Sequence, residues 1–247
     1  MAGILFIISA PSGSGKSTLV NEVRQQLTGI EFSVSYTTRP PRGSEQDGRE
    51  YHFITREEFE KRIGEGDFLV YAEVFGNYYG TSRQSLEHAR NEGHDLILDI
   101  DVKGATQVRE KMPEAVSIFV MPPNPKSLRT RLRNRSRAEG KVNEAELYLR
   151  LSQASKEIEN YHQYGYILVN DVLDRAVAQL EAIVLAERFY RNDEPIAFRS
   201  RRVLEVAAAC LQSNSGERLN PVLEAFGILG ENADQPQLDF EEDSDDD

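Results

Sequence analysis

A short apolar run, residues 4–9, is followed at once by a glycine-rich turn and then by apolar residues at helical spacing. The branched side chains of the run suit a strand that is buried on both faces of a parallel sheet. The turn has glycines at positions 13 and 15 and ends in Gly-Lys-Ser, which is typical of loops whose backbone N–H groups converge on phosphate oxygens at the start of a helix. Strand, glycine turn and helix in this order predict a phosphate-binding loop.

The residue types in the loop indicate what it binds. Lys16 would place a positive charge on the β- and γ-phosphate oxygens, and the Ser17 hydroxyl would ligate Mg²⁺. A strict version of the motif begins with glycine where this chain has Ala10, but the converging N–H groups do not depend on that position. The alternative is a Gly/Ser turn that only joins a strand to a helix. We therefore expect a site for ATP with Mg²⁺, formed by Ala10, Pro11, Ser12, Gly13, Ser14, Gly15, Lys16, Ser17 and Thr18.

The rest of the chain alternates short apolar runs with segments at helical spacing. We expect strands over residues 4–9, 32–36, 51–54, 68–75, 96–100, 117–121 and 166–169. Helices are expected over residues 19–27, 56–64, 82–91, 104–111, 126–135, 143–161, 176–190, 199–212 and 220–226. This pattern predicts the α/β class with a parallel central sheet and helices on both of its faces.

Composition limits the kinds of partner. The chain has 247 residues and a formal charge of −12, but seven of its carboxylates lie in the last nine residues. The remainder has a modest formal charge of −5, which argues against a broad surface for nucleic acid or for an anionic membrane. The single Cys210 cannot form an internal disulfide, and no apolar stretch is long enough to span a membrane. We expect a cytoplasmic protein.

The apolar run before Asp99 and Asp101 predicts another buried strand with acidic residues at its end. In phosphate-loop folds such a strand brings a carboxylate towards the metal ion. The alternative is that the aspartates only cap the following turn. Together with the phosphate loop, the pattern favours Asp99 as a metal-organising group.

Three further segments carry a resemblance to a known family. They are residues 33–42, with Gly43, Gly48, Tyr51 and Phe53 after them, residues 75–82, and residues 98–101. In order and spacing they resemble the motifs of guanylate kinases, and the likeness runs from about residue 3 to about residue 192. The resemblance implies a P-loop three-layer fold with a small mixed α/β GMP-binding subdomain and a helical lid. It also implies ATP- and Mg²⁺-dependent phosphorylation of GMP, and of dGMP, to the diphosphate.

The resemblance implies roles for the acceptor-side residues. Arg39, Arg42, Tyr51 and Tyr79 match the clamp on the GMP phosphate, which suits two guanidinium forks and two phenol donors. The matching positions for guanine are Ser35 and Thr81 at O6 and Asp101 at the N–H edge, while Asp99 matches a group that organises the water shell of Mg²⁺.

Alternate arginines in residues 131–137 give the lid segment a high positive charge. Such a run is often only a solvated basic face. The resemblance implies instead that Arg131, Arg135 and, on the next helix, Arg150 contact ATP phosphates, and that Asn170 lies near the adenine. With these residues, the expected catalytic set is Lys16, Arg39, Arg131, Arg135 and Arg150.

One position departs from the family pattern. Guanylate kinases have a glutamate that holds guanine N1 and N2, and the matching residue here is Val70. Valine accepts no hydrogen bond, so the loss of a charged acceptor would cost on the order of 1.5–3 kcal/mol of binding. Glu73 is the nearby carboxylate that we include among the expected GMP contacts. It lies three residues along the strand and would need an irregular backbone to reach the same face.

The expected organisation is a kinase domain over residues 1–193, with a core (3–34 and 94–193), a GMP-binding part (about 35–90) and a lid (about 129–155). A helical extension (194–230) and an acidic, disordered tail (231–247) follow. Two other functions stay open: a kinase for a different nucleoside monophosphate, and a non-catalytic binding module of the same shape. The oligomeric state is also open.

Overall fold

The computed structural model describes residues 3–43, 45–74, 76–138, 143–192 and 198–229. Its central sheet has five strands in the order β2-β7-β1-β8-β9, all parallel. These are β1 (Leu5–Ser9), β2 (Ile30–Ser33), β7 (Asp95–Asp99), β8 (Val116–Met121) and β9 (Tyr166–Val169). The parallel sheet expected from the sequence is confirmed. Strand β1 lies between β7 and β8, so the loop after β1 opens at the carboxyl edge of the sheet, where such folds bind ligands.

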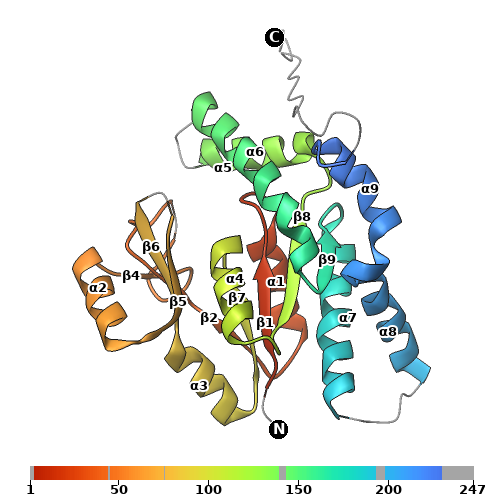
Figure 1. Ribbon diagram of the computed structural model, residues 1–247, viewed down its shortest axis with the longest axis horizontal. Coiled ribbons are helices and arrows are strands. Elements are labelled where there is room, and N and C mark those ends of the chain that lie inside the picture. Colours follow the sequence, from red (N-terminus) through yellow and green to blue (C-terminus); the bar gives the residue numbers. More distant parts are fainter. Residues whose placement is uncertain (1–2, 44, 75, 139–142, 193–197, 230–247) are drawn as a thin grey trace.

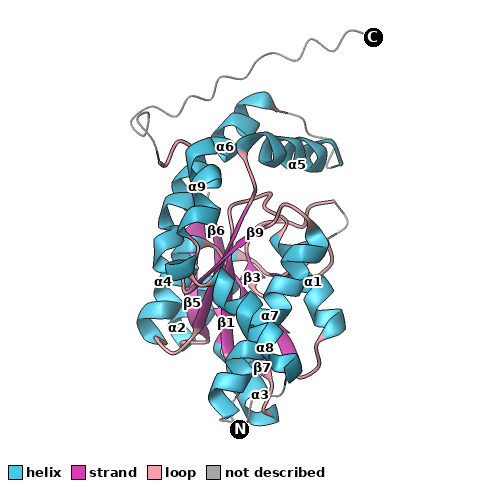
Figure 2. Cartoon of the chain, turned by 90° about the vertical axis from the view of Figure 1, so that its right-hand side faces the viewer, coloured by secondary structure: helices cyan, strands magenta, loops and turns pink. Residues whose placement is uncertain are grey.

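Each face of the central sheet is covered by helices. Alternate side chains of β1 point to opposite faces: Phe6 and Ile8 pack with helices α1, α7 and α8, whereas Leu5 and Ile7 pack with the opposite layer. Figure 2 shows strands between α1 on one side and α4 on the other. The first layer contains α1 (Lys16–Gln26), α7 (Leu173–Asn192) and α8 (Phe198–Cys210). The second contains α3 (Arg83–Glu92), α4 (Val102–Lys111), α5 (Pro125–Ala138), α6 (Glu144–Ile158) and α9 (Gly216–Ala225).

A second, four-stranded sheet lies beside the central one (Figure 1), in the order β4-β3-β6-β5. Its strands are β3 (Tyr36–Thr37), β4 (His52–Phe53), β5 (Phe68–Val74) and β6 (Asn77–Ser82). Helix α2 (Arg56–Glu65) packs on it through the buried Phe59, whose ring stacks on Phe68 at 4.4 Å between centroids. Helix α3 then leads back to β7 of the central sheet.

The segment after α7 covers the edge of the central sheet. The backbone N–H of Gln212 donates to the Gly165 carbonyl at 2.9 Å, and the Arg218 guanidinium donates to the Ile167 carbonyl at 2.9 Å. A single antiparallel bridge also joins Leu211 to Tyr166 of β9. Because β9 is an edge strand, these contacts pair backbone groups that would otherwise face solvent. A 3₁₀ turn (Gln212–Asn214) joins α8 to α9, and another, Glu159–Gln163, joins α6 to β9.

Some expected bounds were wrong. The single strand expected over residues 32–36 is two strands, because the chain leaves the central sheet after Ser33 and enters the small sheet at Tyr36. The long helix expected over residues 143–161 ends at Ile158 and tightens into the 3₁₀ turn. The acidic tail (231–247) and residues 139–142 of the expected lid lie outside the described residues. Within the described ranges, no helix combines the length and apolar composition needed to cross a membrane.

Candidate functional site

A cleft of about 1300 Å³ lies between the phosphate loop, the small sheet and helices α5 and α6. Its lining includes every site residue expected from the sequence except Glu73. The structure therefore brings the two ends of the expected site, one for the triphosphate and one for the acceptor, into one continuous space.

The phosphate loop joins β1 to α1 in a conformation that needs glycine at two positions. Gly13 and Gly15 have φ angles of 87° and 85°, which L side chains rarely adopt. There is also no room for a side chain at these positions: a Cβ on Gly15 would lie 2.5 Å from the Asn170 amide nitrogen, and one on Gly13 would lie 2.9 Å from Leu132. Ala10 is buried and packs in the cluster beneath α1, so its methyl group is accommodated.

The back of the loop is held by Arg131 and Asn170. The Arg131 guanidinium donates to the Ser14 carbonyl at 3.1 Å and to the Asn170 carbonyl at 2.8 Å. The Asn170 side-chain amide donates to the same Ser14 carbonyl at 2.8 Å. Two hydrogen bonds to the Ser14 carbonyl thus tie the loop to α5 and to the end of β9, and a third joins Arg131 to Asn170. Asn170 is 4% exposed, which places it under the loop rather than on the surface.

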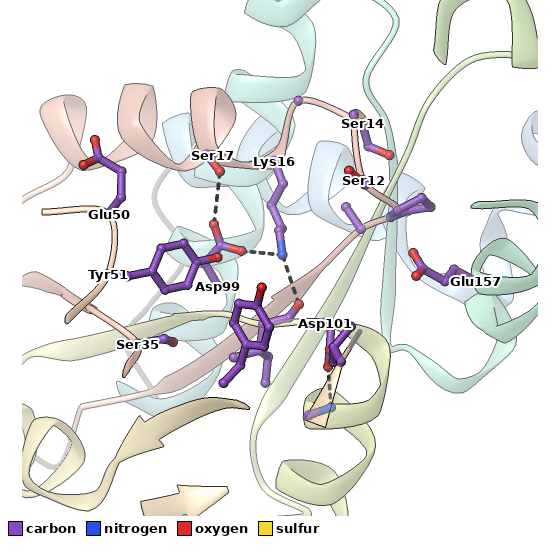
Figure 3. A pocket seen from close by; sticks show the side chains of 18 of the residues that line it. Ser12, Ser14, Lys16, Ser17, Ser35, Glu50, Tyr51, Asp99, Asp101 and Glu157 are labelled. Atoms are coloured by element: carbon purple, nitrogen blue, oxygen red, sulfur yellow. Dashed lines mark hydrogen bonds and ion pairs between the residues drawn. The ribbon is translucent and has the colours of Figure 1, made fainter. Parts of the chain in front are cut away.

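Lys16, Ser17 and Asp99 form a cluster at the mouth of the loop (Figure 3). The Lys16 ammonium is ion-paired with the Asp99 carboxylate and donates to the Ile100 carbonyl at 3.0 Å. The Ser17 hydroxyl donates to Asp99 Oδ2 at 3.4 Å. A hydroxyl and a carboxylate side by side are hard oxygen donors of the kind that Mg²⁺ prefers, so these residues fit the metal that the sequence predicts.

At the acceptor end, two phenols surround a buried arginine. Arg39 is 5% exposed, and its guanidinium carbon lies 5.2 Å from the centre of the Tyr51 ring. The rings of Tyr51 and Tyr79 meet edge to face, 5.9 Å apart. Burial raises the pKa of Tyr51 to about 12, with the negative charge of Asp99 adding to the effect. The phenol therefore stays protonated and able to donate a hydrogen bond at neutral pH.

The inner wall of the cleft combines buried hydroxyls with one apolar side chain. Ser35 and Thr81 are both buried, and Val70 is 3% exposed and pairs with Thr81 across strands β5 and β6. On the opposite side, Asp101 caps helix α4 by accepting the Gly104 N–H at 2.7 Å through Oδ1. Val70 thus provides no hydrogen-bond acceptor in this wall, as the sequence predicts.

The expectation for Glu73 requires correction. Its carboxylate lies 3.4 Å from the Arg56 guanidinium, and its side chain does not line the cleft. The irregularity in β5 falls between Phe68 and Val70, before Glu73, which pairs with Tyr78 in regular register. Because strand side chains alternate, Glu73 points away from the wall that contains Val70.

The arginines of α5 have different environments. Arg131 and Arg135 line the cleft, whereas Arg133 is ion-paired with Glu144 at 3.0 Å and joins α5 to α6. Arg150 lines the cleft from α6, and its guanidinium donates to Glu146 one turn earlier at 2.5 Å. Arg131, Arg135 and Arg150 therefore face the cleft, whereas Arg133 links the two helices.

Sequence reasoning missed four glutamates of the cleft, Glu45, Glu50, Glu146 and Glu157, of which the first and the last matter most here. Glu45 forms a bidentate ion pair with Arg39, and Glu157 faces the cleft from the end of α6. The signal for Glu157 was its spacing, seven residues after Arg150, which puts both on one face of a helix. Glu45 lies in a turn, where the spacing of residues does not indicate which way a side chain points.

Comparison with known proteins identifies close relatives. The family model described as guanylate kinase matches residues 3–187. A guanylate kinase from Koribacter versatilis is 51% identical, covering 92% of this chain and 97% of the relative. One from Vibrio cholerae is 46% identical, covering 78% of this chain and 92% of the relative. The crystal structure of a guanylate kinase from Anaplasma phagocytophilum has a TM-score of 0.63 and 35% identity, with 75% of this chain and 86% of that chain covered.

Proposed function

The chain belongs to the guanylate kinase family, and from this premise we propose that its cleft transfers the γ-phosphoryl group of ATP to GMP, giving ADP and GDP. The observation that supports the proposal most is the continuity of the cleft. One space joins a phosphate loop to a second phosphate clamp built from Arg39, Arg42, Tyr51 and Tyr79. Two phosphate-binding ends in one cleft suit a donor and an acceptor that both carry phosphate. We extend the acceptor to dGMP, because the assigned contacts are to phosphate and base.

The assigned residues position substrates and balance charge. The GMP phosphate oxygen that attacks already carries negative charge, so the transfer needs no general base. In a loose transition state the catalytic task is alignment and neutralisation of spread-out charge. Lys16 and the phosphate-loop N–H groups hold the β- and γ-phosphates, while Arg39 and Arg42 hold the acceptor. The positive charges for the transferring group come from Arg131, Arg135 and Arg150.

We assign the Mg²⁺ that accompanies ATP to Ser17 directly and to Asp99 through water. When bound, the metal ion supplies charge neutralisation to the β- and γ-phosphate oxygens. Asp99 is meanwhile ion-paired with Lys16, which keeps both groups at the mouth of the loop before the nucleotide enters. On ATP binding the ammonium is expected to turn from Asp99 to the phosphates.

Closure of the cleft is the second part of the proposal. We propose that residues 35–90 and the helical lid (about 129–155) approach the core when both nucleotides are bound, which would exclude water from the transfer. The tie between Arg133 and Glu144 suggests that α5 and α6 move together. Since ATP and GMP are nucleotides of the cytoplasm, we place the reaction there, without a nucleic-acid or membrane partner.

A coupled assay of ADP release with GMP, dGMP, AMP, UMP and CMP tests the proposal. We expect the guanine nucleotides to give the highest kcat/KM. Preference for another monophosphate would overturn the choice of acceptor, and the absence of turnover with all five would favour a binding module. Neither alternative has support beyond Val70, because the phosphate loop is intact and the relatives named above are guanylate kinases.

A further inference from the structure

Glu157 ends a stripe of side chains that helix α6 presents to the cleft. The stripe contains Glu146, Arg150, Gln153 and Glu157, at spacings of three and four residues, and the adjacent face of the helix buries Leu151 and Ile158. Glu146 and Arg150 pair with each other near the start of the helix. The last member, Glu157, lines the cleft at the C-terminal end of the helix. Figure 3 shows it in the same pocket as Asp101, whose charge acts on it.

Among the residues that the structure describes, the Glu157 carboxylate has no hydrogen-bond or ion-pair partner, and its side chain is half-buried in the cleft wall. Burial, and then the negative charge of Asp101, raise the pKa of Glu157 to about 7, while Lys16 and Lys103 oppose the shift. Two carboxylates that face one cavity without a shared donor repel each other, and a ligand that donates N–H groups between them relieves this repulsion.

The acceptor base offers that type of ligand. Guanine presents N1–H and a 2-amino group on one edge, whereas adenine presents the N1 lone pair in the same place and would be repelled by a carboxylate. Val70, in the facing wall, accepts nothing. Asp101 already uses Oδ1 on the α4 N-terminus, which leaves one oxygen for a base. One carboxylate oxygen alone is too few acceptors for three N–H donors.

We propose that Glu157 is a specificity-determining residue that accepts the guanine 2-amino group beside Asp101, in place of the carboxylate that Val70 does not supply. This inference rests on the proposed function, because it assigns the base contact of the same acceptor site.

The test compares GMP with IMP, which lacks the 2-amino group. Wild type, Glu157→Gln and the control Glu159→Gln are assayed with ATP at saturating concentration. Glu159 is the exposed glutamate two residues further on and does not line the cleft. We expect Glu157→Gln to lower kcat/KM for GMP by about 10- to 100-fold, mainly through KM, and to change kcat/KM for IMP by less than about threefold. Glu159→Gln is expected to leave both values unchanged.

A ratio of GMP to IMP efficiency that survives in Glu157→Gln would overturn the inference, because a purely structural role would lower both substrates equally. If Glu157→Gln does not fold, Glu157→Asp is the second variant, because it keeps the charge but shortens the side chain by one methylene group. The GMP-to-IMP ratio of kcat/KM in Glu157→Asp then tests the inference in the same way. Adding Val70→Glu to Glu157→Gln offers a gain-of-function check, since a carboxylate restored on the facing wall should recover GMP use. If wild type phosphorylates GMP but the ratio is unchanged in Glu157→Gln, the proposed function stands and this inference fails. If wild type is inactive on GMP, both fail.

Discussion

Arg39 and Glu45 form a bidentate ion pair inside the acceptor end of the cleft, with Nη1–Oε2 at 2.7 Å and Nη2–Oε1 at 3.0 Å. Glu45 also accepts the backbone N–H of Arg42 at 2.8 Å. Burial alone would raise the pKa of Glu45, but the hydrogen bonds from Arg39 and Arg42 hold it below its usual value. One carboxylate thus orients the Arg39 guanidinium and holds the backbone at Arg42, the two arginines that we assign to the GMP phosphate.

Glu45→Gln is expected to raise KM for GMP by about 10-fold while changing KM for ATP little, because the amide keeps the shape but loses the charge that aligns the Arg39 fork. Steady-state kinetics with each substrate varied in turn measures the effect. Glu65→Gln, on the exposed end of α2, is the matched control. Equal increases in both KM values would contradict a positioning role at the acceptor end.

Gly15→Ala is expected to remove most ATP-dependent activity, by at least about 100-fold, because the methyl group meets the Asn170 amide at 2.5 Å and the backbone is strained at φ 85°. Calorimetry of ATP binding and a turnover assay both measure this loss. Gly66→Ala separates the two causes, since Gly66 has φ 74° with no atom within 4 Å of the added carbon. That control should lose about 1 kcal/mol of stability and keep its activity. Full activity in Gly15→Ala would show that the loop can shift away from Asn170.

Lys16→Ala is expected to lower kcat by about 1,000-fold or more with the fold intact, because the ammonium is the loop's point charge for the transferring phosphoryl group. Circular dichroism and thermal unfolding check the fold, and ADP release checks turnover. Lys111→Ala serves as the control, since Lys111 donates to the Leu69 carbonyl away from the phosphate loop. GDP formation by Lys16→Ala at a near-normal rate would rule out the assigned mechanism.

Glu157→Gln is expected to stabilise the protein at pH 8 by about 1–3 kcal/mol relative to wild type. The folded-state pKa of about 7 lies above the usual 4.5, so the native state binds more protons and wild type loses stability as pH rises between these values. The difference should therefore shrink towards zero near pH 4.5 and reach its full size above pH 7. Urea unfolding at pH 5, 6, 7 and 8 measures it. A difference independent of pH would mean that the charge of Glu157 is not the cause.

Much of the site could be predicted from the sequence because its residues follow local rules. The phosphate loop depends on glycines and a Gly-Lys-Ser ending within eight residues. Helix ends follow equally local rules: Gly93 ends α3 in the left-handed conformation that glycine favours. The valine at position 70, where guanylate kinases have a glutamate, was also visible, because the resemblance aligns this segment with the family motif.

What the sequence could not show was which side chains share a space across long separations. Glu73 was expected in the cleft because it is near Val70 along the chain, but the pleat of β5 turns it towards Arg56. Glu157, 87 residues after Val70, faces the same cleft only because α6 packs over the sheet and presents one stripe to it. The phosphate loop thus follows from the chain itself, since its geometry is set by adjacent dihedral angles. The environment of the acceptor base is decided by the packing of α6 and β5, because distance in space there bears no relation to distance along the sequence.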